Sequence, residues 1–433
     1  MTDTYITNAT WALNGDKIDL RMGSNHGDEL TTLFLNDVPL SGVSAVAPAG
    51  KMEIPTGARV IEAEGKLLMP ALFDLHAKIE IAGCSKRECI YRNGQAAIQG
   101  GVWGMLVMPT KGFCFDNAST LDSFEDAVTQ RSAATMIPAG CITEGMEGSQ
   151  QTPYNTLAAR GVNILSDAEH VTDNLLMLHR AMKYAAELGL TFAIRGDVPA
   201  LTKNTYMHPG TTSYRLGLHG TPACAEEIGL ETIIRLAQDA GAKLHVQTVS
   251  TAAGVDIIRR AKQSGMTNLT AEVALHHLLY THENVGDYDT TFKTLPPLRD
   301  QADCEALLQG VKDGTIDCIV SDHTPCIPFA KKQDFVSAPQ GMVSLDTFLQ
   351  AIYTLLVQPG KLSWAEVVRA CCITPAGIAN PYEQEEGTPI AAPLLLFDPN
   401  EEFTVTEELM NCGTTNTPLL GQKLRGGITL PLC

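Results

Sequence analysis

The sequence has 433 residues, of which 44% are hydrophobic and 18% charged, and its formal net charge is -18 at pH 7. A chain of this length and composition can bury a large core, and one large domain with a smaller companion fits it best. The excess of acidic residues argues against nucleic acids and anionic lipid surfaces as partners, because like charges repel. We therefore expect the partners to be proteins or small molecules.

The first twenty residues, MTDTYITNATWALNGDKIDL, include acidic residues and no apolar core, so we expect no secretory signal. No apolar run approaches the length of a membrane span. The twelve cysteines contain no CxxC pair, which argues against a zinc ribbon and a thioredoxin-type motif. We therefore expect a cytoplasmic protein with free thiols rather than disulfides.

Short β-like runs broken by Gly, Pro, Asn and Asp fill the first sixty residues, at Tyr5 to Leu13, Thr32 to Leu35 and Gly57 to Glu62. From about Leu67, apolar runs alternate with longer helical patterns. The eight apolar runs are LLMPALFDL, WGMLVMP, TMIPAG, GVNILSD, LTFAIRG, AKLHVQTVS, NLTAEVAL and DCIVSD.

Apolar residues recur at helical spacing between these runs, for instance at 173–188, 225–240 and 252–264. Parallel strands buried on both faces read as continuous apolar runs, so the pattern predicts an α/β protein with a TIM-type (β/α)8 barrel. After a helical stretch at 363–379, the C-terminal segment again has the sequence pattern of strands and turns. We predict a barrel over residues 67–383 and a small β-rich domain formed from both termini, 1–66 plus 384–433.

The stretch KLLMPALFDLHAK resembles the first barrel strand of the amidohydrolase superfamily, and later landmarks resemble a dihydroorotase in order. These are GQAAIQGGVWGMLVMPT, NILSDAEHVTDN, LGLHGTPACAEE, LHVQTVSTAAG, AEVALHHLLYT, KTLPPLR, VSDHTP, APQGMVSLDTFL and the tail EEGTPIAAPLLLFDPNEEFTV with NTPLLGQKLRG. The resemblance spans roughly residues 60 to 425 and implies the dihydroorotase family, although a fold by itself does not fix a function.

This resemblance implies a site in which two zinc ions activate a hydroxide that attacks a cyclic amide. The family's ligand positions, from the first histidine to the last, proton-shuttling acid, fall on His76, Lys78, Asp167, Arg195, Thr248 and Asp322. Lysine and arginine side chains stay protonated at neutral pH and do not coordinate a dication. We therefore expect no metal cofactor, and we expect Lys78 and Arg195 to form direct ion pairs with Asp167 and Asp322.

The family's substrate-binding positions are altered as well. The arginine that should hold the substrate carboxylate falls on Glu80, so an attraction has become a repulsion. The two asparagines fall on Thr110 and Leu295, and the last histidine falls on Cys326. The combined changes predict the loss of dihydroorotase chemistry, with Asp322 as a catalytic remnant that no longer functions.

Ordinary structural roles compete with these interpretations. His76 lacks its histidine partner and is typical of a satisfied core histidine. Asp322 is typical of a carboxylate in an ordinary buried ion pair with Arg195 or Lys78. The adjacent His276 and His277 are expected to point in different directions at a strand end, which disfavours a new metal site. His245 lies on an apolar strand and is expected to be structural.

The cysteines nearest the expected barrel mouth, Cys84, Cys89 and Cys326, are expected to be small buried hydrophobes rather than nucleophiles.

Three hypotheses for function remain open. The first is a catalytically inactive dihydroorotase-like subunit of pyrimidine biosynthesis, a structural partner of aspartate carbamoyltransferase and itself a homo-oligomer. The second is an active dihydroorotase or other cyclic-amide hydrolase with an altered site, for instance one metal held by His76, Asp167 and Asp322. The third is a binding module in which Lys78 and Arg195 anchor an anionic small molecule.

Overall fold

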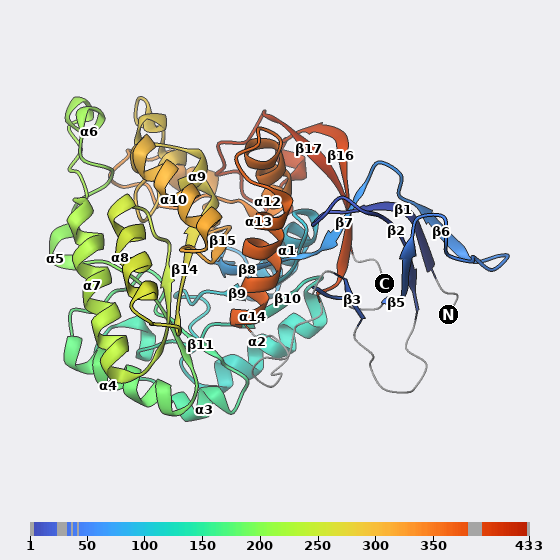
Figure 1. Ribbon diagram of the computed structural model, residues 1–433. Helices are drawn as coiled ribbons and strands as arrows, with labels where there is room; N and C mark the ends of the chain where they lie inside the picture. The colour runs from blue at the N-terminus through green and yellow to red at the C-terminus, as the bar shows by residue number, and fades with distance from the viewer. Residues whose placement is uncertain (1–3, 24–32, 36–37, 41–42, 380–391, 431–433) are drawn as a thin grey trace.

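The computed structural model of the protein describes residues 4–23, 33–35, 38–40, 43–379 and 392–430 (Figure 1). Its larger part is a barrel of eight parallel strands, as the alternation of apolar runs and helical patterns predicts. The barrel strands are β8 (Leu72–Ala77), β9 (Val102–Val107), β10 (Thr135–Pro138), β11 (Ile164–Leu165), β12 (Thr191–Arg195), β13 (Lys243–Gln247), β14 (Leu269–Ala274) and β15 (Cys318–Val320).

Two hydrogen-bonded sheets make up the wall, β10-β9-β8 and β11-β12-β13-β14-β15. Parallel bridges between Gly140 and Leu165 and between Ala77 and His323 join the two sheets into a ring. Nearly every residue of β8, β9 and β14 is buried, since helices cover the outer face while side chains fill the interior. The predicted (β/α)8 barrel is thereby confirmed.

Helices surround this wall and connect its strands. The α-helices are α1 (Lys86–Gln99), α2 (Ala118–Arg131), α3 (Tyr154–Ala158), α4 (Leu175–Glu187), α5 (Pro199–Thr202), α6 (Thr211–Leu216), α7 (Ala223–Ala240), α8 (Ala252–Gln263), α9 (Leu275–Leu279), α10 (Gln301–Asp313), α11 (Pro328–Lys331), α12 (Phe348–Ile352), α13 (Trp364–Val368) and α14 (Thr374–Ala379). The short helical turns are η1 (Glu144–Met146), η2 (His282–Val285), η3 (Thr290–Phe292), η4 (Leu345–Thr347) and η7 (Glu407–Leu409), and the π-helical turns are η5 (Tyr353–Val357) and η6 (Arg369–Ile373).

Three predicted helical stretches correspond to α4, α7 and α8, and the stretch 363–379 is a run of α13, η6 and α14. Side-chain caps mark several helix starts. Thr251 accepts from the Gly254 amide at the start of α8, and Asp300 accepts from the Asp303 amide at the start of α10. No helix in the described ranges is both long and apolar enough to cross a membrane.

Strands from both ends of the chain form one smaller sheet beside the barrel. Its order is β17-β16-β7-β1-β2-β5, and β6 also pairs with β1. These strands are β1 (Thr4–Trp11), β2 (Lys17–Met22), β5 (Val43–Pro48), β6 (Arg59–Glu62), β7 (Leu67–Pro70), β16 (Leu394–Thr404) and β17 (Lys423–Thr429), and a separate hairpin joins β3 (Leu33–Leu35) to β4 (Val38–Leu40). In Figure 1 the red β16 runs beside the blue β7, and β17 lies on the other side of β16.

The run LLMPALFDL is divided between the two sheets. β7 pairs with β1 and β16, whereas β8, one residue further on, starts the barrel. β7 follows directly after the predicted boundary at residue 66, and the second predicted boundary, residue 384, lies outside the described residues. The division into two domains stays a prediction.

Candidate functional site at the ends of the barrel strands

The backbone bends sharply where three barrel strands end. Ala168 after β11, Thr248 after β13 and Asp322 after β15 have φ values of 52°, 45° and 45°. A left-handed backbone costs a residue with a side chain about 1–3 kcal/mol, so it persists only where the surroundings impose it. Two of these residues, Thr248 and Asp322, are positions at which the family resemblance places metal ligands. The left-handed turns therefore occur both where the family's acid is kept, at Asp322, and where the ligand position carries a threonine, at Thr248.

Inside these turns lies a group of buried polar side chains, which we call the inner cluster: His76, His245, Glu272, His276 and Asp322. Glu272 on β14 is at its centre and is fully buried. Its Oε1 lies 2.6 Å from His76 Nδ1, and its Oε2 lies 3.0 Å from His245 Nε2. The Thr248 amide also donates to Glu272 Oε1, at 3.3 Å. One carboxylate therefore joins β8, β13 and β14 across the interior of the barrel.

His76 and Glu272 are held as an ion pair. Burial alone would raise the pKa of Glu272, but the charge of His76 and the hydrogen bonds from both imidazoles lower it to about 2. Burial would lower the pKa of His76, but the charge of Glu272, its hydrogen bond and the charge of Asp322 raise that pKa above its ordinary value. The raised pKa favours the protonated His76 ring, which cannot act as a neutral metal ligand.

Asp322 lies between two imidazoles. Its Oδ1 is 3.6 Å from His76 Nε2, and its Oδ2 is 3.6 Å from His276 Nε2. Burial raises the pKa of Asp322, and the positive charges of His76 and Lys78 oppose that rise. Burial lowers the pKa of His276 well below its usual value, so His276 is neutral. Asp322 therefore pairs with His76 and not, as predicted, with Arg195 or Lys78.

Lys78 and Arg195 take other partners than expected. Lys78 Nζ is 2.9 Å from Glu169 Oε2, and Arg195 Nη2 is 3.2 Å from Asp197 Oδ2. Both acids lie in loops directly after barrel strands, within two residues of a position that the resemblance marks. The expectation of direct ion pairs with Asp167 and Asp322 was wrong, because these nearer carboxylates are better placed.

The charge of Lys78 is stable in this setting. Burial would lower its pKa, but the charges of Glu169 and Asp322 outweigh burial and raise the pKa. In return, the charge of Lys78 lowers the pKa of Glu169 to about 2. A protonated amine therefore occupies the position of the family's second histidine.

Asp167 supports a loop instead of facing a cation. Its Oδ1 accepts from the amides of Ile142 and Thr143 at 2.8 and 3.0 Å, and its Oδ2 accepts from Thr143 Oγ1 at 2.6 Å. Burial raises the pKa of Asp167, and the hydrogen bonds from Thr143 and Ile142 counteract it. Asp167 thus fixes the segment after β10, and its lone pairs are used in doing so.

The residues present do not fit two divalent ions. Two of the six ligand positions carry cations, a third is Thr248, and His76 and Asp167 are both engaged by other groups. No group of three or more His, Cys, Asp or Glu side chains in the described part of the chain is arranged to hold a metal. The one-metal arrangement of His76, Asp167 and Asp322 is accordingly not assembled.

A cavity of about 450 Å³ opens above the inner cluster, and Lys78, Glu80, Thr110, Lys111, Glu169 and His170 are among the residues that line it. Two of the four altered substrate positions, Glu80 and Thr110, therefore share this cavity with Lys78. Glu80 Oε2 accepts from the Gly112 amide at 2.9 Å, which directs its carboxylate to the protein's own backbone.

The other two substrate positions do not line that cavity. Leu295 is half-buried in the segment before Pro296. Cys326 is buried, with its thiol 3.6 Å from the carbonyl oxygen of Gln340, and burial raises the pKa of that thiol. A raised pKa disfavours the thiolate, as expected for a structural cysteine.

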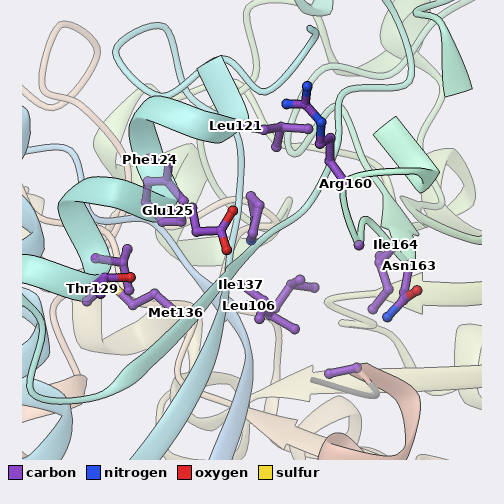
Figure 2. A pocket seen from close by; sticks show the side chains of 14 residues that line it. Leu106, Leu121, Phe124, Glu125, Thr129, Met136, Ile137, Arg160, Asn163 and Ile164 are labelled. Carbon is purple, nitrogen blue, oxygen red and sulfur yellow. The ribbon is translucent and has the colours of Figure 1, made fainter. Parts of the chain in front are cut away.

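A second cavity, of about 200 Å³, lies on the outer wall between α2 and strands β9 to β11 (Figure 2). Leu106, Phe124, Met136 and Ile164 form much of its lining, and none of the ligand or substrate positions borders it. It is separate from the chemistry that the resemblance implies.

Sequence reasoning missed Glu272, Glu169 and Asp197. Glu272 is the only charged residue of the apolar run NLTAEVAL. Its spacing of two from Thr270, which bonds His245 at 2.8 Å, places both on the interior face of β14. A single acidic residue in an otherwise apolar strand was the sequence signal that could have identified Glu272 as a site residue. His276 and His277 begin α9 rather than end a strand, and their ring centroids lie 4.6 Å apart.

Comparison with known proteins agrees with this architecture. A family model described as Dihydro-orotase-like matches residues 65–253. A protein named dihydroorotase from Mycobacterium leprae is 34% identical over 400 residues, which cover 92% of this chain and 93% of that protein. A dihydroorotase from Caldanaerobacter subterraneus is 35% identical over 403 residues, covering 92% and 91%.

Solved structures with the same fold are more distant in sequence. An L-hydantoinase from Arthrobacter aurescens has a TM-score of 0.80 at 19% identity, over 100% of this chain and 95% of that one. A dihydropyrimidinase from Brevibacillus agri has a TM-score of 0.77 at 20% identity, over 98% and 92%. From the near full-length similarity to the dihydroorotases, the chain belongs to the dihydroorotase family.

Proposed function

We propose that this protein is an inactive dihydroorotase-like subunit of pyrimidine biosynthesis that serves as a structural partner of aspartate carbamoyltransferase. The observation that carries the proposal is the Lys78–Glu169 ion pair at 2.9 Å, beside a His76 ring that faces a carboxylate from each nitrogen. A site built in this way has fixed positive charge where the family's chemistry needs metal-bound hydroxide.

The substrate side of the site supports the same proposal. Dihydroorotate carries a carboxylate, and Glu80 presents a second carboxylate where the family resemblance places an arginine. Two carboxylates repel each other and cannot form a bidentate hydrogen bond, and Glu80 is already bonded to the Gly112 amide. Loss of catalysis and loss of substrate affinity then have related causes. Lys78 puts a positive charge at a metal-ligand position, and Glu80 puts a negative charge at the position of the substrate-binding arginine.

A structural role accounts for the closed barrel and for the buried inner cluster. The ring of eight strands is closed, and the inner cluster ties β8, β13 and β14 together through Glu272. The former centre therefore stabilises the barrel, whose outer surface remains free to bind another protein. We propose that aspartate carbamoyltransferase of the same organism binds this outer surface and that the complex contains several copies of the chain.

Catalysis is tested with the purified protein, dihydroorotate and added zinc. The proposal predicts no turnover, with the dihydroorotase from Mycobacterium leprae as the active reference. Turnover that disappears in Asp322→Ala would instead favour a cyclic-amide hydrolase with altered chemistry. Hydantoin is assayed alongside, since that alternative includes other cyclic amides.

Partnership is tested by co-expression with aspartate carbamoyltransferase, size-exclusion chromatography and a carbamoyl-transfer assay. We expect co-elution and a higher or more stable carbamoyl-transfer activity. Lys78→Met is the matched control: it changes the cavity but not the outer surface, so the complex should be unaffected. Two separately eluting proteins with unchanged activity would refute the partnership, whatever the outcome of the dihydroorotate assay.

A further inference from the structure

Two cysteine thiols outside the inner cluster touch one another. Cys114 lies in the loop after β9 and Cys141 in the loop after β10, and their sulfur atoms are 3.7 Å apart. The backbones of the two loops are already joined, because the Cys141 amide donates to the carbonyl oxygen of Phe115 at 3.0 Å. A disulfide has a sulfur–sulfur distance of about 2.05 Å, so the sulfurs need to approach by less than 2 Å.

The two thiols differ in their access to solvent. Cys114 is half-buried and lines a cavity of about 620 Å³ whose other walls come from α1 and α2. Lys86 and Arg87 also line this cavity, as do Asp122 and Asp126. Cys141 is fully buried behind Cys114. A small oxidant can therefore reach Cys114 from the cavity, whereas Cys141 is closed to solvent.

We propose that Cys114 and Cys141 are a peroxide-sensitive thiol pair that closes to a disulfide, with Cys114 as the attacking thiol and Cys141 as the resolving thiol. The contact with Cys141 also lowers the pKa of Cys114 below its usual value, whereas the same contact and burial raise the pKa of Cys141. The more accessible thiol, Cys114, is the one that meets the oxidant first, and the buried Cys141 is in contact with it to resolve the product.

The oxidant is a hydroperoxide, and the reaction balances in two steps. The Cys114 thiolate attacks one peroxide oxygen, the O–O bond breaks, and the departing hydroxide takes up a proton to become water. Cys114 is then a sulfenic acid. The Cys141 sulfur attacks the Cys114 sulfur, the S–O bond breaks, and the Cys141 proton leaves with the hydroxide as a second water. The two sulfurs together lose two electrons, which reduce the O–O bond of hydrogen peroxide to two waters.

The disulfide would fix two loops at the barrel mouth. Cys141 directly precedes Ile142 and Thr143, whose amides bind Asp167. Cys114 follows Thr110 and Lys111, which line the cavity above the inner cluster. Oxidation would therefore tie the loop that holds Asp167 to the loop that borders the cavity. Because the cross-link spans 27 residues, we expect it to raise the Tm by a few degrees.

Peptide mapping tests the proposal directly, because trypsin releases the two cysteines in separate peptides. Residues 112–131 contain only Cys114, and residues 132–160 contain only Cys141. The reduced full-length protein is treated with a small excess of hydrogen peroxide, alkylated, digested and analysed by mass spectrometry. We expect the two peptides linked, with the loss of two hydrogens, and separated again by dithiothreitol.

Variants separate the two roles. In Cys141→Ser, Cys114 should accumulate as a sulfenic acid that dimedone traps, whereas in Cys114→Ser no link should form. Cys224→Ser is the matched control, because Cys224 is exposed and outside the pair, and its link yield should equal that of the unaltered protein. If a variant does not fold, the peptide map of the unaltered protein still shows whether Cys114 and Cys141 form a disulfide. Unlinked peptides after oxidation, or Cys114 linked to any other cysteine, would overturn the proposal.

Discussion

Replacing Glu272 by glutamine tests whether the inner cluster stabilises the barrel by charge. Glutamine keeps the size of the side chain and some hydrogen bonding but removes the negative charge that faces His76 and His245. The pKa of Glu272 falls from 4.5 to about 2 in the folded protein. At about 1.4 kcal/mol for each pKa unit, this difference corresponds to about 3 kcal/mol of unfolding free energy. The raised pKa of His76 reports the same interaction, so the two effects are not added.

The loss should depend on pH in a defined way. A carboxylate with a lowered pKa stabilises the fold above 4.5, and this contribution disappears as the pH falls towards about 2. A histidine with a raised pKa stabilises the fold below 6.5, and this contribution disappears as the pH rises through its folded-state pKa. The difference between the unaltered protein and Glu272→Gln should therefore be greatest between pH 4.5 and 6.5.

Urea unfolding, followed by tryptophan fluorescence and by circular dichroism, measures this difference at several pH values. The two signals must coincide before a single free energy is assigned. Glu231→Gln is the control, because Glu231 forms an exposed pair with Arg260 at 3.4 Å and should change stability by less than about 0.5 kcal/mol. Equal losses for the two variants, or a loss for Glu272→Gln that does not vary with pH, would refute the charged His76–Glu272 pair.

Two further predictions concern the metal positions and the packing. The triple variant Lys78→His, Arg195→His and Thr248→His should bind zinc measurably in isothermal titration, whereas the unaltered protein should not; equal binding by both would contradict the electrostatic argument. Gly100→Ala should cost more than about 2 kcal/mol in urea unfolding, because a Cβ there would lie 1.7 Å from the Leu345 carbonyl oxygen. Gly377→Ala in α14, where a Cβ meets nothing within 4 Å, should be neutral or slightly stabilising.

The barrel could be predicted from sequence because its strands are buried on both faces and so form uninterrupted apolar runs. The small sheet was predicted less completely. β2 and β5 were not among the expected strands, since KIDLRM and VSAVAP mix polar and small residues and depend on pairing with each other for their structure. β7 could not be distinguished from β8, because both belong to one apolar run and only tertiary pairing separates them.

The site positions could be named from family landmarks, but their partners could not. Lys78 and Asp322 are far apart in sequence, and opposite charge alone suggested that they pair. The partner of Lys78 is Glu169, two residues beyond the position that the landmarks mark, and only the path of the loop after β11 brings the two side chains to 2.9 Å. Side-chain pairing across a barrel mouth depends on loop geometry, which local sequence patterns do not encode.

The pairing of β16 with β7 has a consequence for how the chain is made. Leu394 to Phe397 align with Pro70 to Leu67, so more than three hundred residues separate the partners. While a ribosome is still producing the barrel, the edge of β7 has no neighbour on that side and its backbone groups can pair with other chains. Contacts between such distant segments also form slowly, because a long loop must close first. The newly made chain should therefore depend most on chaperone protection during the interval before β16 emerges.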